Sequence, residues 1–391
     1  MPFLFPFEPD WGSSVQVEIA YKTEIIESRG YREQRLALRR QPRKTISFQV
    51  TALRENFLTF MRRIATQQQA EWVVPEVTRA AETSATAFSG ATSVQLGSVK
   101  PWASVGSWIV IRASSGLLIR QLTATAGTVL SFAAPLPATL ALGSEVYPGL
   151  IGRLSQSIRM KTPTNSIVQG TIELSADPGA NVYEAETVAP LTFNGRELFL
   201  QRSNWGSVPS VDFEGFLETV DYGRGVVSHF IPVNWNVVKT QKEYMLRGPD
   251  EANEFTAFLH RMKGQQGEFY TPSGSMDFNL SIGALATETI LDVPGSEVFD
   301  LYEESPVHKA IWVRFSDGSW QANRVLSIAM AGLNSRITVL DPWEQDVSSE
   351  NARIVSWLSA YRLSVDTVSL DWLTKKVSRA KLTMQTVEDL V

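Results

Sequence analysis

The sequence contains no cysteine and only three histidines among its 391 residues. The absence of cysteine excludes disulfide bonds, thiolate nucleophiles and cysteine-ligated zinc sites. His229, His260 and His308 lie too far apart in the sequence to predict a pair of metal ligands. Glycine-rich phosphate loops, G-x-S-x-G nucleophile motifs and H-E-x-x-H zinc motifs are also absent. The sequence therefore predicts a protein that is not an enzyme, with no catalytic residues, no metal site and no cofactor.

Long apolar runs are missing as well. The weakly polar stretch 129–142 is broken by Pro135 and Pro137 and is shorter than the roughly 18 to 20 residues that a membrane-spanning helix needs. The apolar start 1–7 lacks a basic residue and is followed at once by Glu8, which is unlike a secretion signal. We therefore expect a product made in the cytoplasm, without membrane insertion. A net charge of −5 gives no general attraction to nucleic acid.

The sequence does contain a long internal repeat. Motifs of the first half recur in the same order about 195 residues later, which is far longer than the roughly 20 to 50 residues of a solenoid unit. Each copy is therefore long enough to be a globular unit with its own core. The matched motifs are Trp11-Gly12-Ser13 with Trp205-Gly206-Ser207, Arg29-Gly30 with Arg224-Gly225, 68–75 with 265–272, Gly116 with Gly318, and Leu154-Ser155 with Leu358-Ser359.

Alternating apolar and polar residues predict a mainly β fold with a few helices. In the first copy, 1–175, we expect a core of 1–80 and 152–175, interrupted by a small β-barrel or sandwich at 85–150. The second copy, 201–391, should repeat this arrangement with a core of 201–280 and 355–391 and an insertion at 282–352. The segment 176–200 should connect the copies through a hairpin, because Asn194-Gly195 is typical of a two-residue turn.

Each copy should contain one amphipathic helix. Apolar residues recur there with the spacing i, i+3, i+4 and i+7, which places them on one face of a helix. They are Phe57, Phe60, Met61 and Ile64 in the first copy and Phe255, Phe258, Leu259 and Met262 in the second. We expect Phe57, Phe60, Phe255 and Phe258 to anchor the helices in the core. Thr51 and Asp250 are candidate helix caps.

A basic cluster distinguishes the first copy from the second. Seven basic residues occur within sixteen positions, and the corresponding segment of the second copy does not repeat this cluster. We expect these residues to form a solvated face or an oligomer interface, with contact to nucleic acid as the alternative. The cluster consists of Arg29, Arg32, Arg35, Arg39, Arg40, Arg43 and Lys44, and the six arginines are our interface candidates.

The start of the chain carries a series of short motifs: Leu4-Phe5-Pro6-Phe7-Glu8-Pro9-Asp10-Trp11, Thr23-Glu24, Glu33-Gln34-Arg35, Leu38-Arg39 and Pro42-Arg43. With these motifs it resembles the tail-tip proteins of long, flexible-tailed bacteriophages. The helix with a Phe-x-x-Phe motif, followed by a Gln/Gly turn and an aromatic strand, is similar to distal-tail proteins, which join the tail tube to the tip. The inserted modules are similar to small β-modules of such proteins.

This resemblance implies two tandem tail-tube-like domains in a structural protein of the virion tail tip or baseplate. Such a protein would form a ring around the DNA channel at the distal end of the tail tube. A trimer of a two-copy chain offers six similar domains to a six-fold tube, although a hexamer is possible. Its partners would be the tail tube, the tape measure, the tip or hub proteins, and DNA only as it passes. The alternative is a host-receptor or carbohydrate-binding tail-tip protein that uses exposed aromatic residues.

Overall fold

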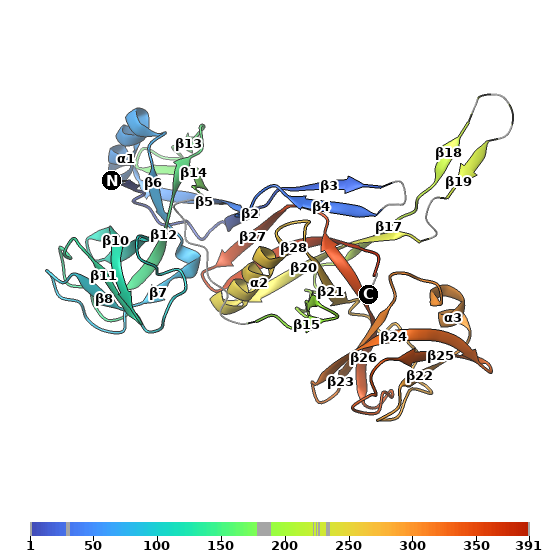
Figure 1. The fold of residues 1–391 in the computed structure, drawn as a ribbon. Helices are drawn as coiled ribbons and strands as arrows, with labels where there is room; N and C mark the ends of the chain where they lie inside the picture. The colour runs from blue at the N-terminus through green and yellow to red at the C-terminus, as the bar shows by residue number, and fades with distance from the viewer. Residues whose placement is uncertain are drawn as a thin grey trace.

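The computed structural model describes residues 2–28, 32–177, 189–221, 223, 225, 227–231 and 235–389. The fold is mainly β, as predicted, with 49% strand, 10% helix and three α-helices in the described part. Most strands belong to one large sheet, in which antiparallel pairs predominate. Figure 1 shows this sheet at the centre of an elongated molecule, with one compact β-module at the left and another at the lower right.

The first half of the chain contains one α-helix and a short 3-10 helix, η1. Its strands are β1 (Phe3–Leu4), β2 (Val15–Ala20), β3 (Thr23–Glu27), β4 (Glu33–Ala37), β5 (Arg43–Leu53), β6 (Trp72–Pro75), β7 (Ala81–Glu82), β8 (Ser93–Gln95), β9 (Trp108–Ala113), β10 (Gly116–Ala126), β11 (Val129–Phe132), β12 (Glu145–Leu154), β13 (Met160–Lys161) and β14 (Ile167–Ala176). The helices are α1 (Arg54–Gln67) and η1 (Val77–Arg79).

The second half begins with a short hairpin, β15 and β16, whose turn residues Asn194 and Gly195 have φ of 48° and 74°. The strands are β15 (Thr192–Phe193), β16 (Arg196–Leu198), β17 (Ser210–Glu214), β18 (Glu218–Val220), β19 (Ser228–Phe230), β20 (Val237–Arg247), β21 (Glu268–Pro272), β22 (Ile290–Pro294), β23 (Ala310–Phe315), β24 (Trp320–Ala331), β25 (Asn334–Val339), β26 (Ala352–Leu363), β27 (Thr367–Thr374) and β28 (Val377–Thr386). The helices are α2 (Gly248–Met262) and α3 (Glu297–Tyr302).

The two halves pair their strands in the same order. β5 pairs with β14 as β20 pairs with β28, and β6 pairs with β12 as β21 pairs with β26. The module strands repeat the order β9–β10–β11–β8 as β23–β24–β25–β22. Strands of the two halves can therefore be matched by position. A tandem duplication remains our interpretation of this correspondence.

The strand pairs correct one motif match from the sequence. Leu154 lies opposite Leu174 on β14, and Leu363 lies opposite Met384 on β28. Gly152 lies opposite Trp72, and Tyr361 lies opposite Phe269, the counterpart of Trp72 in the repeat. Leu154 therefore corresponds to Leu363 rather than to Leu358, and Leu174 corresponds to Met384. The apparent match of Leu154-Ser155 with Leu358-Ser359 reflects a common dipeptide and not a common position in the fold.

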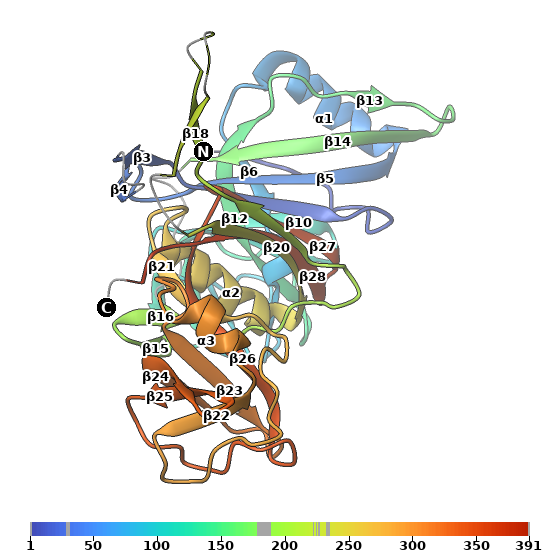
Figure 2. The ribbon, with the colours of Figure 1, turned by 90° about the vertical axis from the view of Figure 1, so that its right-hand side faces the viewer.

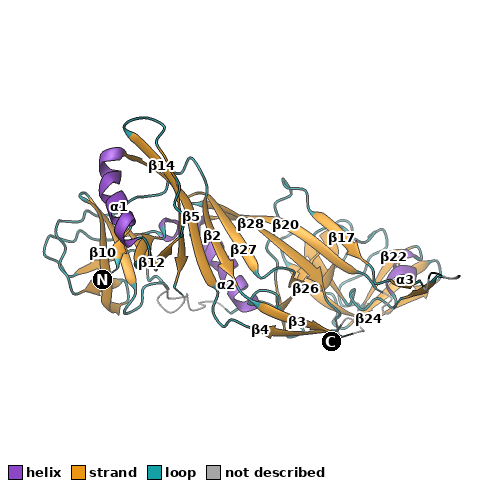
Figure 3. Ribbon diagram, turned by 90° about the horizontal axis from the view of Figure 1, so that it is seen from above, coloured by secondary structure: helices purple, strands orange, loops and turns teal. Residues whose placement is uncertain are grey.

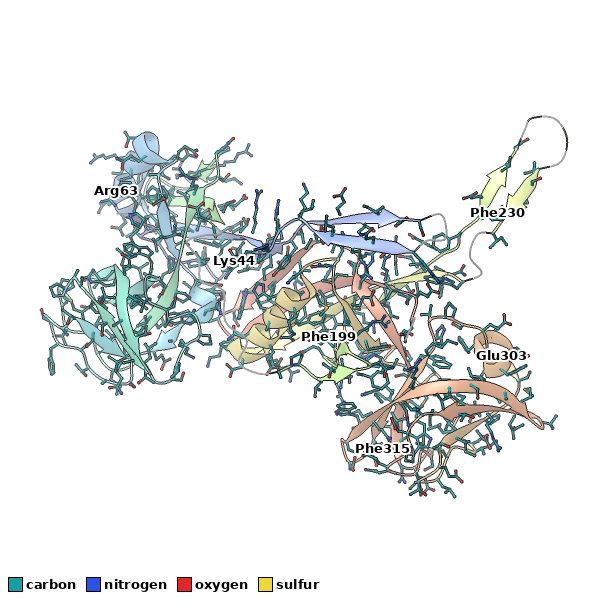
Figure 4. All side chains as sticks on the ribbon, viewed as in Figure 1. Lys44, Arg63, Phe199, Phe230, Glu303 and Phe315 are labelled. Carbon is teal, nitrogen blue, oxygen red and sulfur yellow. The ribbon has the colours of Figure 1, made fainter. Side chains whose placement is uncertain are left out.

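Both long helices pack on the central sheet through their phenylalanines. Phe57, Phe60, Phe255 and Phe258 are each at most 2% exposed, within one shared hydrophobic core. Figure 4 labels Phe199, whose ring stacks on Phe258 with 4.2 Å between centroids.

Two local predictions for these helices are wrong. Met61 is exposed, because the buried stripe of α1 is narrower than its apolar sequence pattern. The cap positions are Leu53 and Arg247 instead of Thr51 and Asp250, and neither makes a side-chain capping bond. Thr51 belongs to β5, and its hydroxyl donates to the carboxylate of Asp10 at 2.6 Å.

Each inserted module has a hydrophobic core separate from that of the central sheet. A single long strand joins each module to the sheet. In the first half, β12 pairs with β9 through its first residues and with β6 and β14 through its last. β26 does the same with β23, β21 and β28. The strand thus runs without interruption from module to sheet.

Candidate assembly interface

The two halves of the chain are joined edge to edge by the antiparallel pair β2–β27. Six residue pairs form this junction, from Val15 opposite Trp372 to Ala20 opposite Thr367. Val17 lies opposite Leu370, and both side chains are buried. Their alternating pattern places every second side chain of each strand in the same core. The hydrophobic core of the central sheet consequently runs through both halves.

The junction makes one continuous sheet from strands of both halves. Successive pairs give the order β13–β14–β5–β2–β27–β28–β20–β17. Figure 3 shows these strands, from β14 to β17, lying one after another across the molecule. The first half contributes the strands up to β2, and the second half contributes the strands from β27 onward. The halves therefore meet head to tail, through two different edges.

The hairpin β3–β4 extends from β2 across the second half, as Figure 1 shows. Arg362 of β26 donates two hydrogen bonds to the carboxylate of Glu33, with nitrogen–oxygen distances of 2.5 and 2.7 Å. Arg35 forms an ion pair with Glu268 of β21 and donates to the backbone oxygen of Gln266 at 3.3 Å. These bonds link the hairpin β3–β4 of the first half to β26 and β21 of the second.

The turn between β2 and β3 is fixed by one carboxylate of the second half. Asp366 accepts hydrogen bonds from the backbone nitrogen of Thr23 at 2.7 Å, from the hydroxyl of Thr23 at 2.8 Å and from the backbone nitrogen of Gln265 at 3.0 Å. The hydroxyl of Tyr21 lies 2.6 Å from Nδ1 of His260 on α2. Burial, helped by the nearby cations, lowers the pKa of His260 to about 4, so the imidazole is neutral at pH 7.

The basic cluster is divided between the junction and the solvent. Arg35 and Arg32 contact the second half of the same chain. Arg35 pairs with Glu268, and Nε of Arg32 lies 3.6 Å from a carboxylate oxygen of Glu388 in a largely exposed ion pair. Within the described residues, Arg39, Arg40 and Arg43 form no ion pair. Arg40 and Arg43 are exposed, and Arg39 is half-buried. Arg29 lies outside the described residues.

Lys44, the last residue of the basic cluster, points into the protein and pairs with Glu76 at 2.5 Å (Figure 4). Burial lowers the pKa of Lys44 despite the attraction of Glu76. Burial also works to raise the pKa of Glu76, but Lys44 and Arg79 outweigh it and hold the pKa below its ordinary value. The carboxylate of Glu76 is therefore charged at neutral pH, and its ion pair with Lys44 is a structural contact.

A cavity of about 800 Å³ lies beside this pair, between the first half and α2. Two charged pairs contribute to its lining: Lys44 with Glu76, and Arg261, which makes two hydrogen bonds of 2.6 Å to Glu197. No group of three or more potential metal ligands occurs in the described ranges. Among the residues that the structure describes, no helix is both long and apolar enough to span a bilayer.

Several of these contacts could not be predicted from the sequence. Glu33 is the one acid within the basic cluster and belongs to the motif Glu33-Gln34-Arg35, and Glu268 lies in the repeated stretch 265–272, but neither pattern indicates a partner. Asp366 and Arg362 belong to no motif. Their roles arise from the pairing of β2 with β27, which brings together residues more than 300 positions apart. No protein-family model matches the chain, and no curated protein is detectably similar to it. The likeness to tail proteins therefore rests on the motifs quoted above.

Proposed function

We propose that this chain is a structural component of a bacteriophage tail tip or baseplate, where it forms a ring around the DNA channel at the distal end of the tail tube. The observation that carries this proposal is the head-to-tail junction β2–β27. A contact between two different edges leaves one edge of each kind open, so that the same contact can be repeated. When the rotation between neighbours closes, repetition gives a ring.

Two similar halves in each chain explain how such a ring adapts one symmetry to another. Three chains provide six similar domains toward a six-fold tail tube but keep three-fold identity toward the tip. We therefore favour a trimer, with a hexamer as the alternative. The partners would be the tail tube above, tip or hub proteins below, and the tape measure and DNA within the channel. The site of action would be the virion tail tip.

The alternative, a receptor- or carbohydrate-binding protein, has less support. Carbohydrate platforms use several exposed aromatic rings, whereas the inserted modules bury most of theirs. Within residues 85–150, all of which are described, Phe88 is the exposed aromatic residue. Within residues 282–352, also fully described, the exposed aromatic residue is Trp320. One exposed ring in each module does not form a platform.

The oligomeric state of the purified full-length chain tests this proposal. We expect native mass spectrometry to give a defined closed oligomer, with three chains favoured, and electron microscopy to show a ring with six lobes and a central opening. A chain that stays monomeric at every concentration, or that forms only open filaments, would contradict the ring. Binding of the full-length chain to host glycans without any ring would favour the alternative.

A further inference from the structure

We propose that neighbouring chains join by pairing β17 of one chain with the β13 segment of the next, in the register of the internal junction β2–β27. The proposed partner is a second copy of this chain. The inference rests on the ring proposed above, for which it specifies the contact between chains. β13 and β17 are the two terminal strands of the continuous central sheet.

The first observation is that these two strands match the strands of the internal junction. β2 pairs with β5 so that Val17 lies opposite Ile46, and β17 pairs with β20 so that Val211 lies opposite Thr240. Ile46 and Thr240 correspond, since they lie opposite the matching residues Leu174 and Met384. β17 is thus the counterpart of β2, but its outer edge has no partner among the described residues.

The other terminal strand matches in the same way. Met160 of β13 lies opposite Gly170 of β14, and Leu370 of β27 lies opposite Ala380 of β28. β13 is therefore the counterpart of β27, the strand that receives β2 within the chain. One chain consequently contains both members of a second junction, placed at opposite ends of its sheet, where they cannot meet each other.

The second observation is an apolar face on β17 that the described residues leave exposed. Val211 and Phe213 are 50% and 71% exposed, whereas their counterparts Val17 and Ile19 are each 4% exposed at the internal junction. An open strand edge with apolar side chains is prone to pair with another strand. At the other end of the sheet, Ile158 and Met160 pack half-buried against the margin of the core. Ile158 and Met160 would offer Val211 and Phe213 of a neighbouring chain an apolar surface to pack against.

The register of the internal junction predicts which residues would meet. Val17 lies opposite Leu370 and Glu18 opposite Ser369. Transferred to the matching strands, Val211 would lie opposite Met160, and Phe213 opposite Ile158. On the other face of the sheet, the exposed Asp212 would lie opposite the exposed Arg159. Apolar side chains would meet on the core face and opposite charges on the solvent face, which is the combination that stabilises antiparallel pairs.

The hairpin β18–β19 supports the same arrangement. It follows β17 as β3–β4 follows β2, with Thr219 opposite His229 where Ile25 lies opposite Arg35. Unlike β3–β4, it projects away from the rest of the molecule in both Figure 1 and Figure 2. Phe230, labelled on it in Figure 4, is 51% exposed.

The next chain has charged residues in the places where this hairpin would lie. Trp72 lies opposite Gly152 and Phe269 opposite Tyr361, so Glu71 and Arg153 hold the positions of Glu268 and Arg362. Glu268 and Arg362 are the residues that bind the hairpin β3–β4 within the chain. Glu71 and Arg153 keep the same charges and are exposed.

Disulfide crosslinking tests the proposal. Because the chain contains no cysteine, the introduced thiols are the only ones that can form a disulfide. The chain with Asp212→Cys and Arg159→Cys should form covalent oligomers on mild oxidation, visible on non-reducing gels as a ladder that ends at the ring size. The control chain carries Asp212→Cys and Met160→Cys. A shift of one residue moves the thiol to the opposite face of the sheet, where the geometry of a disulfide is not met.

Native mass spectrometry of both variants before oxidation separates the two proposals. If rings form but the Asp212–Arg159 pair crosslinks no better than the control, the edge contact is wrong while the ring stands. If the chain is monomeric and does not crosslink, both proposals are wrong. If the pair crosslinks selectively but only open chains form, the edge contact stands and the ring is wrong.

Discussion

Removing the carboxylate of Glu33 should weaken the junction between the two halves. In Glu33→Gln, the guanidinium of Arg362 loses the negative charge of its partner and one acceptor of its two hydrogen bonds, of 2.5 and 2.7 Å, while its side chain is only 4% exposed. Removing one partner of a buried ion pair typically costs about 3 to 5 kcal/mol. Arg362 keeps hydrogen bonds to the side-chain oxygen of Gln265 and the backbone oxygen of Leu363. We therefore expect a cost of about 3 kcal/mol, the lower end of this range.

Hydrogen exchange measured by mass spectrometry reports this loss locally. Amides of β2 and β27 should exchange about 150-fold faster in the variant, since each 1.36 kcal/mol of opening free energy changes the rate tenfold. The matched control is Glu27→Gln, because Glu27 lies opposite Glu33 on the same hairpin but is exposed. Its effect should stay within about 0.5 kcal/mol. Equal exchange rates in the two variants would refute the role assigned to the ion pair.

Three further outcomes are expected. Phe60→Ala should lower the free energy of unfolding by about 3 to 5 kcal/mol, because it empties a fully buried site, whereas Met61→Ala on the exposed face should change it little; equal denaturant midpoints would contradict this placement of α1. The double variant Arg39→Glu and Arg43→Glu should leave the chain folded but weaken assembly in native mass spectrometry at moderate salt, since neither arginine forms an ion pair within the described residues. An unchanged ring would exclude these arginines from the interface, and loss of DNA binding alone would favour a nucleic-acid contact. The pKa of His260 falls from 6.5 to about 4 on folding, so its neutral form contributes stability that is present above pH 6.5 and is lost as the pH falls toward 4. In His260→Gln the free energy of unfolding should therefore decrease less between pH 7 and pH 4.5 than in the wild type, and equal decreases would contradict the shift.

The parts of the fold that follow from neighbouring residues could be predicted from the sequence. The helix containing Phe57 and Phe60 depends on contacts three and four positions apart, and the hairpin at Asn194-Gly195 depends on two residues that accept positive φ. Alternation of apolar and polar residues also predicted the strand that contains Val17. Each of these patterns involves residues only a few positions apart and can therefore be recognised in a single sequence.

The contacts that join the halves could not be predicted in this way. β2 finds its partner in β27, about 350 residues later, and period-2 alternation is the same for any partner. The basic cluster indicated an interface, but no spacing rule shows that Arg35 contacts Glu268 of the same chain. Asp366 is a single acid in a loop, and its three hydrogen bonds follow from tertiary structure alone.

The covalent link between the halves has a numerical consequence for any assembly built on the junction β2–β27. Because both strands belong to one chain, this contact forms at a tethered effective concentration and does not weaken on dilution. Mass action governs only the contacts between chains, which are half of all the junctions in a closed ring. Halves also enter the ring two at a time. Every closed ring therefore contains an even number of halves, and assemblies of five or seven are excluded by connectivity before any packing energy is considered.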